Sequence, residues 1–230
     1  MKKKSFLIPK LFLLALATIC LSACIKNDNF IRGDAKVRIF NNVINDTSRN
    51  FFFNNVLLQT ALTYNTNSAY LVVEGDKNYT IEARNNITSA ASGSLVLQDS
   101  FKLGKNYSIY YTRKDTLPAT VPNMVMFEDD VRQNINEARV MFINLGYTLG
   151  SNVHFRSEDR KLDLTLKKGD KTDYISFTKV DSTARLYFNL VDSATVIDTI
   201  SYTNFVRGRV YTILFDGTRR GKVKYRVVTN

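Results

Sequence analysis

Polar and apolar residues alternate along most of this chain, a pattern that places successive side chains on opposite faces of a β-sheet. The alternation is clear in four runs, at residues 36–39, 78–83, 105–109 and 222–227. These runs are rich in β-branched and aromatic residues, which favour strands. Clusters of Asn, Asp and Gly separate the runs, and no segment has an apolar stripe of helical period. The pattern therefore predicts an all-β protein of short antiparallel strands.

A long internal repeat divides the chain into two halves. Residues 35–41 match residues 138–144 at an offset of 103 positions, and residues 70–73 match residues 174–177 at an offset of 104. A third block has the same offset: Phe101, Gly104, Tyr107 and Ile109 correspond to Phe205, Gly208, Tyr211 and Ile213. Chance likeness between β sequences is the alternative, but the constant order and spacing of the blocks argue against it.

The repeat predicts two tandem immunoglobulin-like antiparallel β-sandwich domains, at residues 35–130 and 138–230, joined by a polar linker at residues 131–137. Because the linker is short, we expect the two domains to sit end to end. We also expect Gly104 and Gly208 to mark a turn that requires a positive φ angle, with aromatic side chains flanking the turn from the core.

The first 24 residues have a different pattern. Three lysines at residues 2–4 precede a short apolar run, which ends at Leu21-Ser22-Ala23-Cys24. This order is typical of a secretory signal with a lipobox. A transmembrane helix is the alternative, but the uninterrupted apolar core of about a dozen residues is shorter than the roughly 20 residues that a span needs. The pattern resembles that of bacterial lipoproteins.

The resemblance to lipoproteins implies that residues 1–23 are a signal peptide and that Cys24 becomes the acylated N-terminus. A diacylglycerol thioether and an amide-linked chain would then anchor the protein by burying CH₂ groups in a membrane. Residues 24–34 are mostly polar and have no period, as expected for a tether. We therefore expect a lipid-anchored protein of the cell envelope, at the outer membrane, on a face that the sequence leaves open.

The charge of the chain is strongly positive. The formal net charge is +11, and removal of the four lysines of the leader leaves +7 on the mature protein. The basic residues are scattered among acidic ones, so we interpret them as a solvated surface, with contact to an anionic glycan or lipid as the alternative. Export to the envelope argues against nucleic acid as a partner.

Cysteine and histidine are too few for several kinds of site. Cys20 leaves with the leader and Cys24 is acylated, so the mature chain has no disulfide and no thiol nucleophile. His154 is the sole histidine, whereas zinc sites take several Cys or His ligands. Its neighbours Val153 and Phe155 are apolar, so in a strand the His154 side chain points to the opposite, solvent-facing side. We predict no metal and no cofactor.

Acidic residues are the remaining candidates for catalysis. The densest acidic cluster, Glu128-Asp129-Asp130, follows the last predicted strand of the first domain, so we expect a solvated strand end. Calcium ligation by adjacent carboxylates is the alternative. The sequence contains no Gly-x-Ser-x-Gly elbow and no glycine-rich phosphate loop. Four short motifs resemble the Asp-Ser/Thr acceptor for O-glycosylation in exported Bacteroidetes proteins, with acceptors at Thr116, Ser182, Ser193 and Thr199.

Each half of the chain also resembles a known family. The likeness is carried by residues 35–41 and 138–144, and by residues 208–217, which contain a glycine, a Tyr-Thr pair and an apolar strand. In the first half, Ser108 stands in place of the threonine. These features resemble the domain of unknown function 4397 family, which is frequent in lipoproteins of Bacteroidetes-type bacteria. The resemblance implies a pair of immunoglobulin-like sandwiches in the envelope, and it implies no activity and no catalytic residue.

A missing catalytic constellation beside a clear anchor predicts a non-enzymatic binding or structural module that contacts a protein or a glycan. Two alternatives stay open at this point. One is a carbohydrate-active enzyme, which would use a pair of acidic residues. The other is a fimbrial or similar surface subunit, in which a donated edge strand pairs with a neighbouring molecule.

Overall fold

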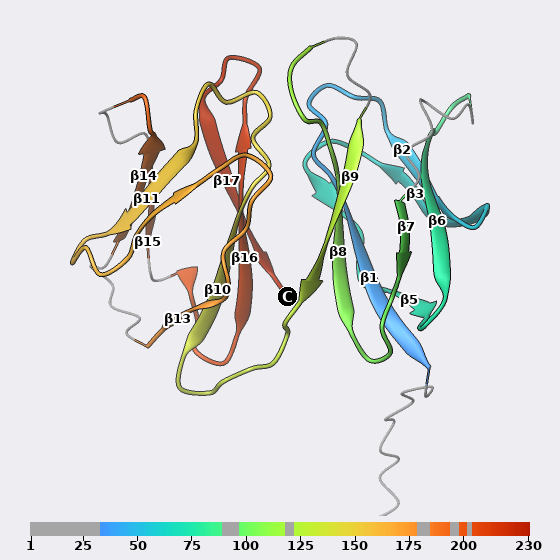
Figure 1. Ribbon diagram of the computed structural model, residues 1–230, viewed down its shortest axis with the longest axis horizontal. Coiled ribbons are helices and arrows are strands. Elements are labelled where there is room, and N and C mark those ends of the chain that lie inside the picture. Colours follow the sequence, from blue (N-terminus) through green and yellow to red (C-terminus); the bar gives the residue numbers. More distant parts are fainter. Residues whose placement is uncertain (1–32, 89–96, 118–121, 179–184, 194–197, 202–203) are drawn as a thin grey trace, which may run out of the picture.

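The computed structural model describes residues 33–88, 97–117, 122–178, 185–193, 198–201 and 204–230. This part of the chain is built from strands and contains no α-helix, so the predicted all-β class is confirmed (Figure 1). Two units follow each other along the chain, and each is a sandwich of two sheets. Residues 1–32, with the predicted signal peptide and Cys24, and Ser182 lie outside the described residues. No helix in the described part is long and apolar enough to cross a membrane.

The described residues of the first unit form nine strands. Its interface sheet consists of β1 (Asp34–Asn41), β4 (Thr66–Asn67), β5 (Leu71–Glu74), β8 (Asn106–Thr112) and β9 (Asn123–Asp129). The order in this sheet is β4-β1-β8-β9, and β5 also pairs with β1. Its outer sheet consists of β2 (Arg49–Phe53), β3 (Val56–Leu62), β6 (Asn78–Asn85) and β7 (Leu97–Ser100). The order there is β3-β2-β6-β7.

The second unit repeats this arrangement, with eight strands among its described residues. Its interface sheet consists of β10 (Ala138–Asn144), β13 (Ile175–Phe177), β16 (Val210–Gly217) and β17 (Val223–Thr229), in the order β13-β10-β16-β17. Its outer sheet consists of β11 (Val153–Ser157), β12 (Asp163–Leu166), β14 (Arg185–Leu190) and β15 (Asp198–Ser201), in the order β12-β11-β14-β15.

Both units have the same topology. The first strand pairs in parallel with the penultimate strand, β1 with β8 and β10 with β16, and the other strand pairs are antiparallel. Val37 lies opposite Tyr107, and Val140 lies opposite Tyr211 at the equivalent positions of the repeat. In constant-type immunoglobulin domains the first strand belongs instead to the sheet ABED, away from the last strands. The sandwich is therefore confirmed, with a strand order of its own.

A separate apolar core fills each sandwich. The alternation of β6 places Tyr79, Ile81 and Ala83 in the first core, while the residues between them are half-buried. The second core is rich in aromatic side chains, and Phe142 stacks on Phe155 with ring centroids 4.4 Å apart. Full burial of one such side chain stabilises the folded state by roughly 1.5–3 kcal/mol.

The repeated Phe-x-x-Gly-x-x-Tyr block forms the same turn in both units. Gly104 has a φ angle of +69° and Gly208 has a φ angle of +79°, as predicted. The hydroxyl groups of Tyr107 and Tyr211 each accept a hydrogen bond from the backbone N–H five residues earlier, at 3.0 Å and 2.9 Å. Each tyrosine therefore fastens the turn that leads into its own strand.

Replacing either of these tyrosines by phenylalanine is expected to lower the free energy of unfolding by about 1 kcal/mol, because a backbone donor loses its partner while the ring stays in the core. The losses in Tyr107→Phe and Tyr211→Phe should agree, since the two turns are equivalent. Urea unfolding measures both variants, with Tyr187→Phe on a half-buried position of β14 as the control. Equal stability of Tyr107→Phe and the wild type would contradict the prediction.

The two units pack side by side through the faces of their interface sheets (Figure 1). The expectation of an end-to-end arrangement is therefore wrong. A third apolar cluster joins the units and contains residues of both: Phe40, Tyr110, Met141, Ile143, Leu145, Leu214 and Val228, with Val125, Phe127 and Tyr174 packed against them. The linker at residues 131–137 is short enough to bring the two faces together and long enough to reverse the chain.

The sequence of β16 explains why its sheet is covered on both sides. Val210–Gly217 is buried at every position, so the strand is not exposed to solvent on either face. Tyr211, Ile213 and Phe215 point into the second core, whereas Leu214 belongs to the cluster between the units. A strand that is apolar at consecutive positions is typical of a sheet covered on both faces.

Candidate functional site

The interface between the units is apolar at its centre. The Phe40 and Tyr110 rings are both fully buried and stack with their centroids 4.6 Å apart. The guanidinium groups of Arg38 and Arg226 lie 5.0 Å and 5.2 Å from the centroid of the Phe40 ring. These cation–π contacts place two positive charges against the Phe40 ring at the edges of the apolar cluster. We call the end of the interface where β1 begins the proximal end and the opposite end the distal end.

Arg38 connects the two units at the proximal end. Its guanidinium donates to the backbone oxygen of Thr229 at 3.0 Å and to the side-chain oxygen of Asn230 at 2.6 Å. It also lies 4.6 Å from the centroid of the Tyr70 ring. Arg38 is 4 % exposed, so these hydrogen bonds compensate for the loss of its hydration.

Asp129 is buried beside this arginine. Its carboxylate accepts hydrogen bonds from Ser108 at 2.6 Å and from Tyr70 at 2.8 Å. Burial raises the pKa of Asp129, and the hydrogen bonds and the charge of Arg38 oppose that rise. The expectation of a solvated strand end is therefore wrong for Asp129, because β9 continues along the interface and carries this residue between the units.

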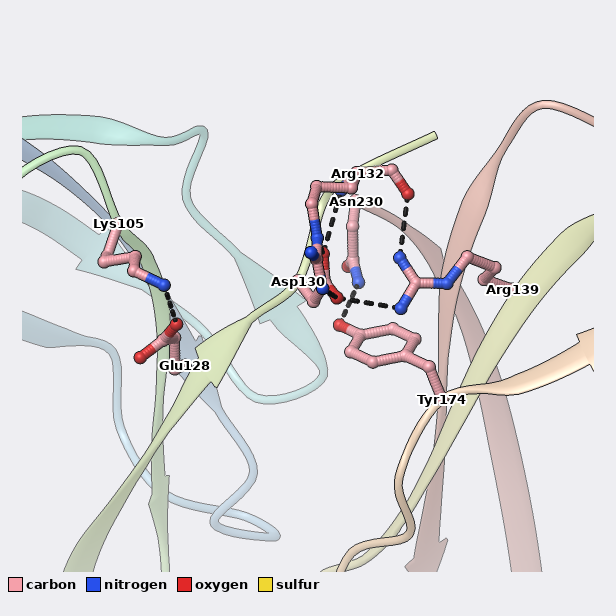
Figure 2. Close-up of polar contacts among 7 residues, drawn as sticks. All are labelled: Lys105, Glu128, Asp130, Arg132, Arg139, Tyr174 and Asn230. Carbon is pink, nitrogen blue, oxygen red and sulfur yellow. Dashed lines mark hydrogen bonds and ion pairs between the residues drawn. The ribbon is translucent and has the colours of Figure 1, made fainter. Parts of the chain in front are cut away.

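The two neighbours of Asp129 lie nearer the surface and form ion pairs (Figure 2). Glu128 accepts from Lys105 at 2.7 Å. Asp130 accepts from Arg132 at 2.6 Å and from Arg139 at 2.8 Å, and these two arginines lower the pKa of Asp130 well below its usual range. Asp130 thereby ties the linker to the first strand of the second unit.

A second buried carboxyl lies toward the distal end. Asp216 accepts the backbone N–H of Gly217 at 2.8 Å and the Tyr64 hydroxyl of the other unit at 3.4 Å. Burial raises the pKa of Asp216 to about 6. Beside it, the backbone N–H of Ile44 donates to the Tyr147 hydroxyl at 2.9 Å, again across the interface.

A cleft opens between the units at the distal end. It has a volume of about 300 Å³ and is lined by Thr112, Arg113, Lys114, Asn123, Val125, Leu145, Tyr147, Lys168 and Gly169. Three of these side chains are cationic and none is acidic. Arg113 and Lys114 follow β8 in the first unit, whereas Lys168 follows β12 in the second. Both units are therefore needed to form the cleft.

The lining indicates what the cleft can bind. Val125, Leu145 and Tyr147 supply an apolar surface, which is typical of pockets for small ligands, and 300 Å³ is at the lower end of their size range. Lys114 and Lys168 take part in no ion pair within the described residues. A concave surface lined by charges of one sign concentrates its field on ligands of the opposite sign. The cleft therefore suits a small anionic ligand with a flat or apolar part.

Hydroxyl and amide groups complete the wall of the cleft. Thr112 is 4 % exposed, and its hydroxyl has no hydrogen-bond partner among the described residues. A buried hydroxyl without a partner destabilises a protein by about 1–3 kcal/mol. Thr112 lies on the interface side of β8, two residues after Tyr110, and its buried hydroxyl lies behind the inner wall of the cleft.

His154 lies away from the cleft, on the outer face of β11. Its imidazole contacts Asp163 at 2.7 Å and Asn189 at 3.4 Å, while Val153 and Phe155 are buried. The predicted direction of its side chain is confirmed. No group of three or more His, Cys, Asp or Glu side chains in the described part is arranged to hold a metal ion.

The predicted glycosylation acceptors occupy different places. Thr116 is exposed just after β8, and Ser193 and Thr199 are half-buried near β14 and β15. None of these three lines the cleft, and their glycosylation stays a prediction of the sequence. The cleft residues were not predicted. The available signal was a pair of basic residues directly after a strand in each unit, Arg113-Lys114 after β8 and Lys167-Lys168 after β12.

The fold and the interface define a class of protein: a pair of β-sandwiches joined face to face, with a basic cleft between them. The family model described as "Domain of unknown function (DUF4397)" matches residues 35–156, which is more than half of the chain. This chain therefore belongs to the domain of unknown function 4397 family. The match begins with β1 and ends in β11, so it extends past the linker.

Two further comparisons add little to this assignment. No curated protein matches the chain in sequence. Among solved structures, the chain is similar to the crystal structure of CBMbc (family CBM26) from Eubacterium rectale Amy13K in complex with maltoheptaose. The TM-score is 0.27 and the identity 10 %, over 86 % of this chain and 97 % of the other. A likeness of this size carries no argument about ligand or function.

Proposed function

We propose that this protein is an envelope-anchored, non-enzymatic binding module whose distal cleft holds an anionic part of a glycan. In this proposal, acyl chains on Cys24 hold the chain at the outer membrane, and the tether at residues 24–34 leads to the proximal end of the first unit. The distal cleft then faces away from the anchor, because its residues Arg113 and Lys114 follow β8, which ends opposite the start of β1 (Figure 1).

The observation that carries the proposal is the composition of the cleft. Arg113, Lys114 and Lys168 lie beside an apolar surface, and the described residues of the lining include no carboxyl, imidazole or thiol group. Glycoside hydrolysis in most families uses a pair of carboxyl groups, one as general acid and one as base or nucleophile. The buried carboxyls Asp129 and Asp216 accept hydrogen bonds inside the interface and do not line the cleft. This composition supports binding. The alternative, a carbohydrate-active enzyme, would need a pair of acidic residues, and the described lining of the cleft does not supply one.

A glycan array followed by a hydrolysis assay on the same glycans tests the proposal. We expect binding of glycans that carry carboxylate or sulfate groups, without turnover. The double variant Lys114→Glu, Lys168→Glu should weaken this binding by about tenfold or more, because the field in the cleft loses its sign. Lys161→Glu, a single charge reversal at an exposed position in the turn after β11, should leave binding unchanged.

Three results would overturn the proposal. Hydrolysis of a bound glycan would make the protein an enzyme, and binding that survives the double variant would place the ligand elsewhere. Binding of acidic peptides in place of glycans would identify a protein partner. A fimbrial or other structural subunit predicts self-association through an edge strand, so size-exclusion chromatography of residues 25–230 at high concentration distinguishes this reading from a monomeric binder.

A further inference from the structure

The proximal end of the molecule has a surface of basic and aliphatic residues that takes no part in the distal cleft. The two equivalent turns of the repeat both lie there, together with the linker (Figure 1). The first turn has the sequence Phe-Lys-Leu-Gly-Lys at residues 101–105, and the second has Phe-Val-Arg-Gly-Arg at residues 205–209. Each turn therefore combines two basic residues with one aliphatic residue beside a buried phenylalanine, and neither contains an acidic residue.

The aliphatic residues of this end are exposed to solvent. Leu103 is 47 % exposed and Val206 is 52 % exposed. Ile135 of the linker is 83 % exposed and lies next to the second turn, since the backbone N–H of Gly208 donates to the oxygen of Asn134 at 3.1 Å. Three large apolar side chains thus extend from the same end of the two units.

The cations beside them are available for a partner. Lys102, Arg207 and Arg209 are exposed and take part in no ion pair within the described residues. The acids Glu74, Glu128 and Asp130 near this end are already held by cations of the protein. Asp34, Asp76 and Glu137 are acids that offset these cations: the first two lie beside the first turn, and Glu137 lies beside the second.

The described part of the chain begins at this surface. Asp34, the first residue of β1, accepts the backbone N–H of Gly104 at 2.8 Å, so the first turn lies directly beside the point where the chain enters the fold. Nine peptide units separate Cys24 from Gly33, and a chain of that length spans at most about 30 Å. Anything that holds the chain near Cys24 therefore holds this end close to the same surface.

We propose that the proximal end, made of the turns at 101–105 and 205–209 and of Ile135, docks on the headgroups of a bilayer that contains anionic lipid. The aliphatic tips enter the headgroup layer, and Lys102, Arg207 and Arg209 contact lipid phosphates. The docking adds a contact between the protein surface and the bilayer to the contact made by the acyl anchor. It also fixes the direction in which the distal cleft points.

Vesicle sedimentation with residues 25–230 tests this proposal without an acyl chain. The three apolar clusters consist of residues between 35 and 228, so this fragment contains all the side chains that hold the fold. We expect binding to vesicles of anionic phosphatidylglycerol at low salt and little binding to neutral phosphatidylcholine vesicles. Each cation near an anionic bilayer strengthens binding by roughly fivefold. The variant Lys102→Glu, Arg207→Glu, Arg209→Glu should therefore lose at least about tenfold, whereas Lys114→Glu, Lys168→Glu at the distal end should lose little.

A position-specific label separates docking from general attraction of a basic protein. Residues 25–230 contain no cysteine, so an introduced cysteine is the sole label site. A polarity-sensitive dye on Val206→Cys should report an apolar environment with anionic vesicles and should be quenched by brominated lipid. The same dye on Val191→Cys, which is 51 % exposed in the turn after β14 at the distal end, should report water.

The proposal fails if residues 25–230 do not bind anionic vesicles at low salt. It also fails if the proximal and distal charge variants lose binding equally, or if labels at 206 and 191 report the same environment. These outcomes are independent of acylation of Cys24 and of the ligand of the cleft. A native protein without lipid on Cys24 would overturn the proposed anchor and leave the vesicle results of residues 25–230 unchanged.

Discussion

Replacing Phe40 by alanine is expected to lower the free energy of unfolding by about 3–5 kcal/mol and to split one unfolding transition into two. Phe40 is fully buried, but its ring belongs to the cluster between the units and not to the core of its own sandwich. Its removal leaves Tyr110 without its stacking partner and leaves Arg38 and Arg226 without the ring that they face. The sandwiches stay intact while their contact weakens.

Phe155→Ala is the matched control for this variant. Phe155 is also fully buried and loses the same atoms, but it lies in the core of the second unit against Phe142. We expect this control to destabilise the second unit by a similar amount and to leave the docking of the units unchanged. Urea unfolding measures stability, and small-angle X-ray scattering measures the separation of the units before unfolding.

The same contact determines whether the cleft exists. Lys114 and Lys168 come from different units, so Phe40→Ala should weaken ligand binding although Phe40 lies outside the cleft. Phe155→Ala should not do so under conditions in which it is folded. A single transition in Phe40→Ala, together with an unchanged scattering profile, would show that the interface does not depend on this ring.

The fold was predictable because its signals are local. A period of two in short runs identifies strands, and the constant offset between the halves identifies two equivalent sandwiches. The role of Gly104 and Tyr107 in the turn was predictable for the same reason, since the block occurs again at Gly208 and Tyr211. Each of these inferences needs only neighbouring residues or the comparison of the chain with itself.

The docking of the units was not predictable from such signals. Phe40 and Leu214 lie on faces that the alternation assigns to the exterior, and they are buried only because another sheet covers them. The run of apolar residues in β16 was the available sign of a sheet covered on both faces. The run indicates that both faces of β16 are covered, but it does not identify the sheet that covers the second face.

Asp129 shows the same limit for polar residues. Three consecutive acids after a strand look like a solvated end, because isolated charges are costly to bury. Here Tyr70 and Ser108 come from positions far away in the chain and supply hydrogen bonds that compensate for burial. The cleft was missed for the same reason, since its cations belong to different units and come together only through docking.

Replacing Asp216 by asparagine is expected to remove a pH dependence of stability between about pH 4 and pH 6. Burial raises the pKa of Asp216 from 3.8 to about 6 in the folded protein. The carboxyl therefore holds its proton in the folded state at pH values where the unfolded chain has already released it. The folded protein binds the extra proton, so stability falls as pH rises through this window and is constant above it. Two pKa units correspond to about 3 kcal/mol.

Between pH 4 and pH 7 the wild type should therefore lose up to about 3 kcal/mol of stability that Asp216→Asn does not lose. The difference in free energy of unfolding between the two proteins shifts by this amount in favour of Asp216→Asn. Asparagine retains an oxygen that can accept from Tyr64 and from the backbone of Gly217. Asp129 has a raised pKa and Asp130 a lowered one, and both remain in the two proteins, so the difference between their stability curves isolates Asp216. Asp173→Asn, an exposed carboxyl before β13, should leave the curve unchanged. Urea unfolding at intervals between pH 4 and pH 8 measures these curves, and parallel curves for Asp216→Asn and the wild type would mean that Asp216 is ionised in the folded protein throughout this range.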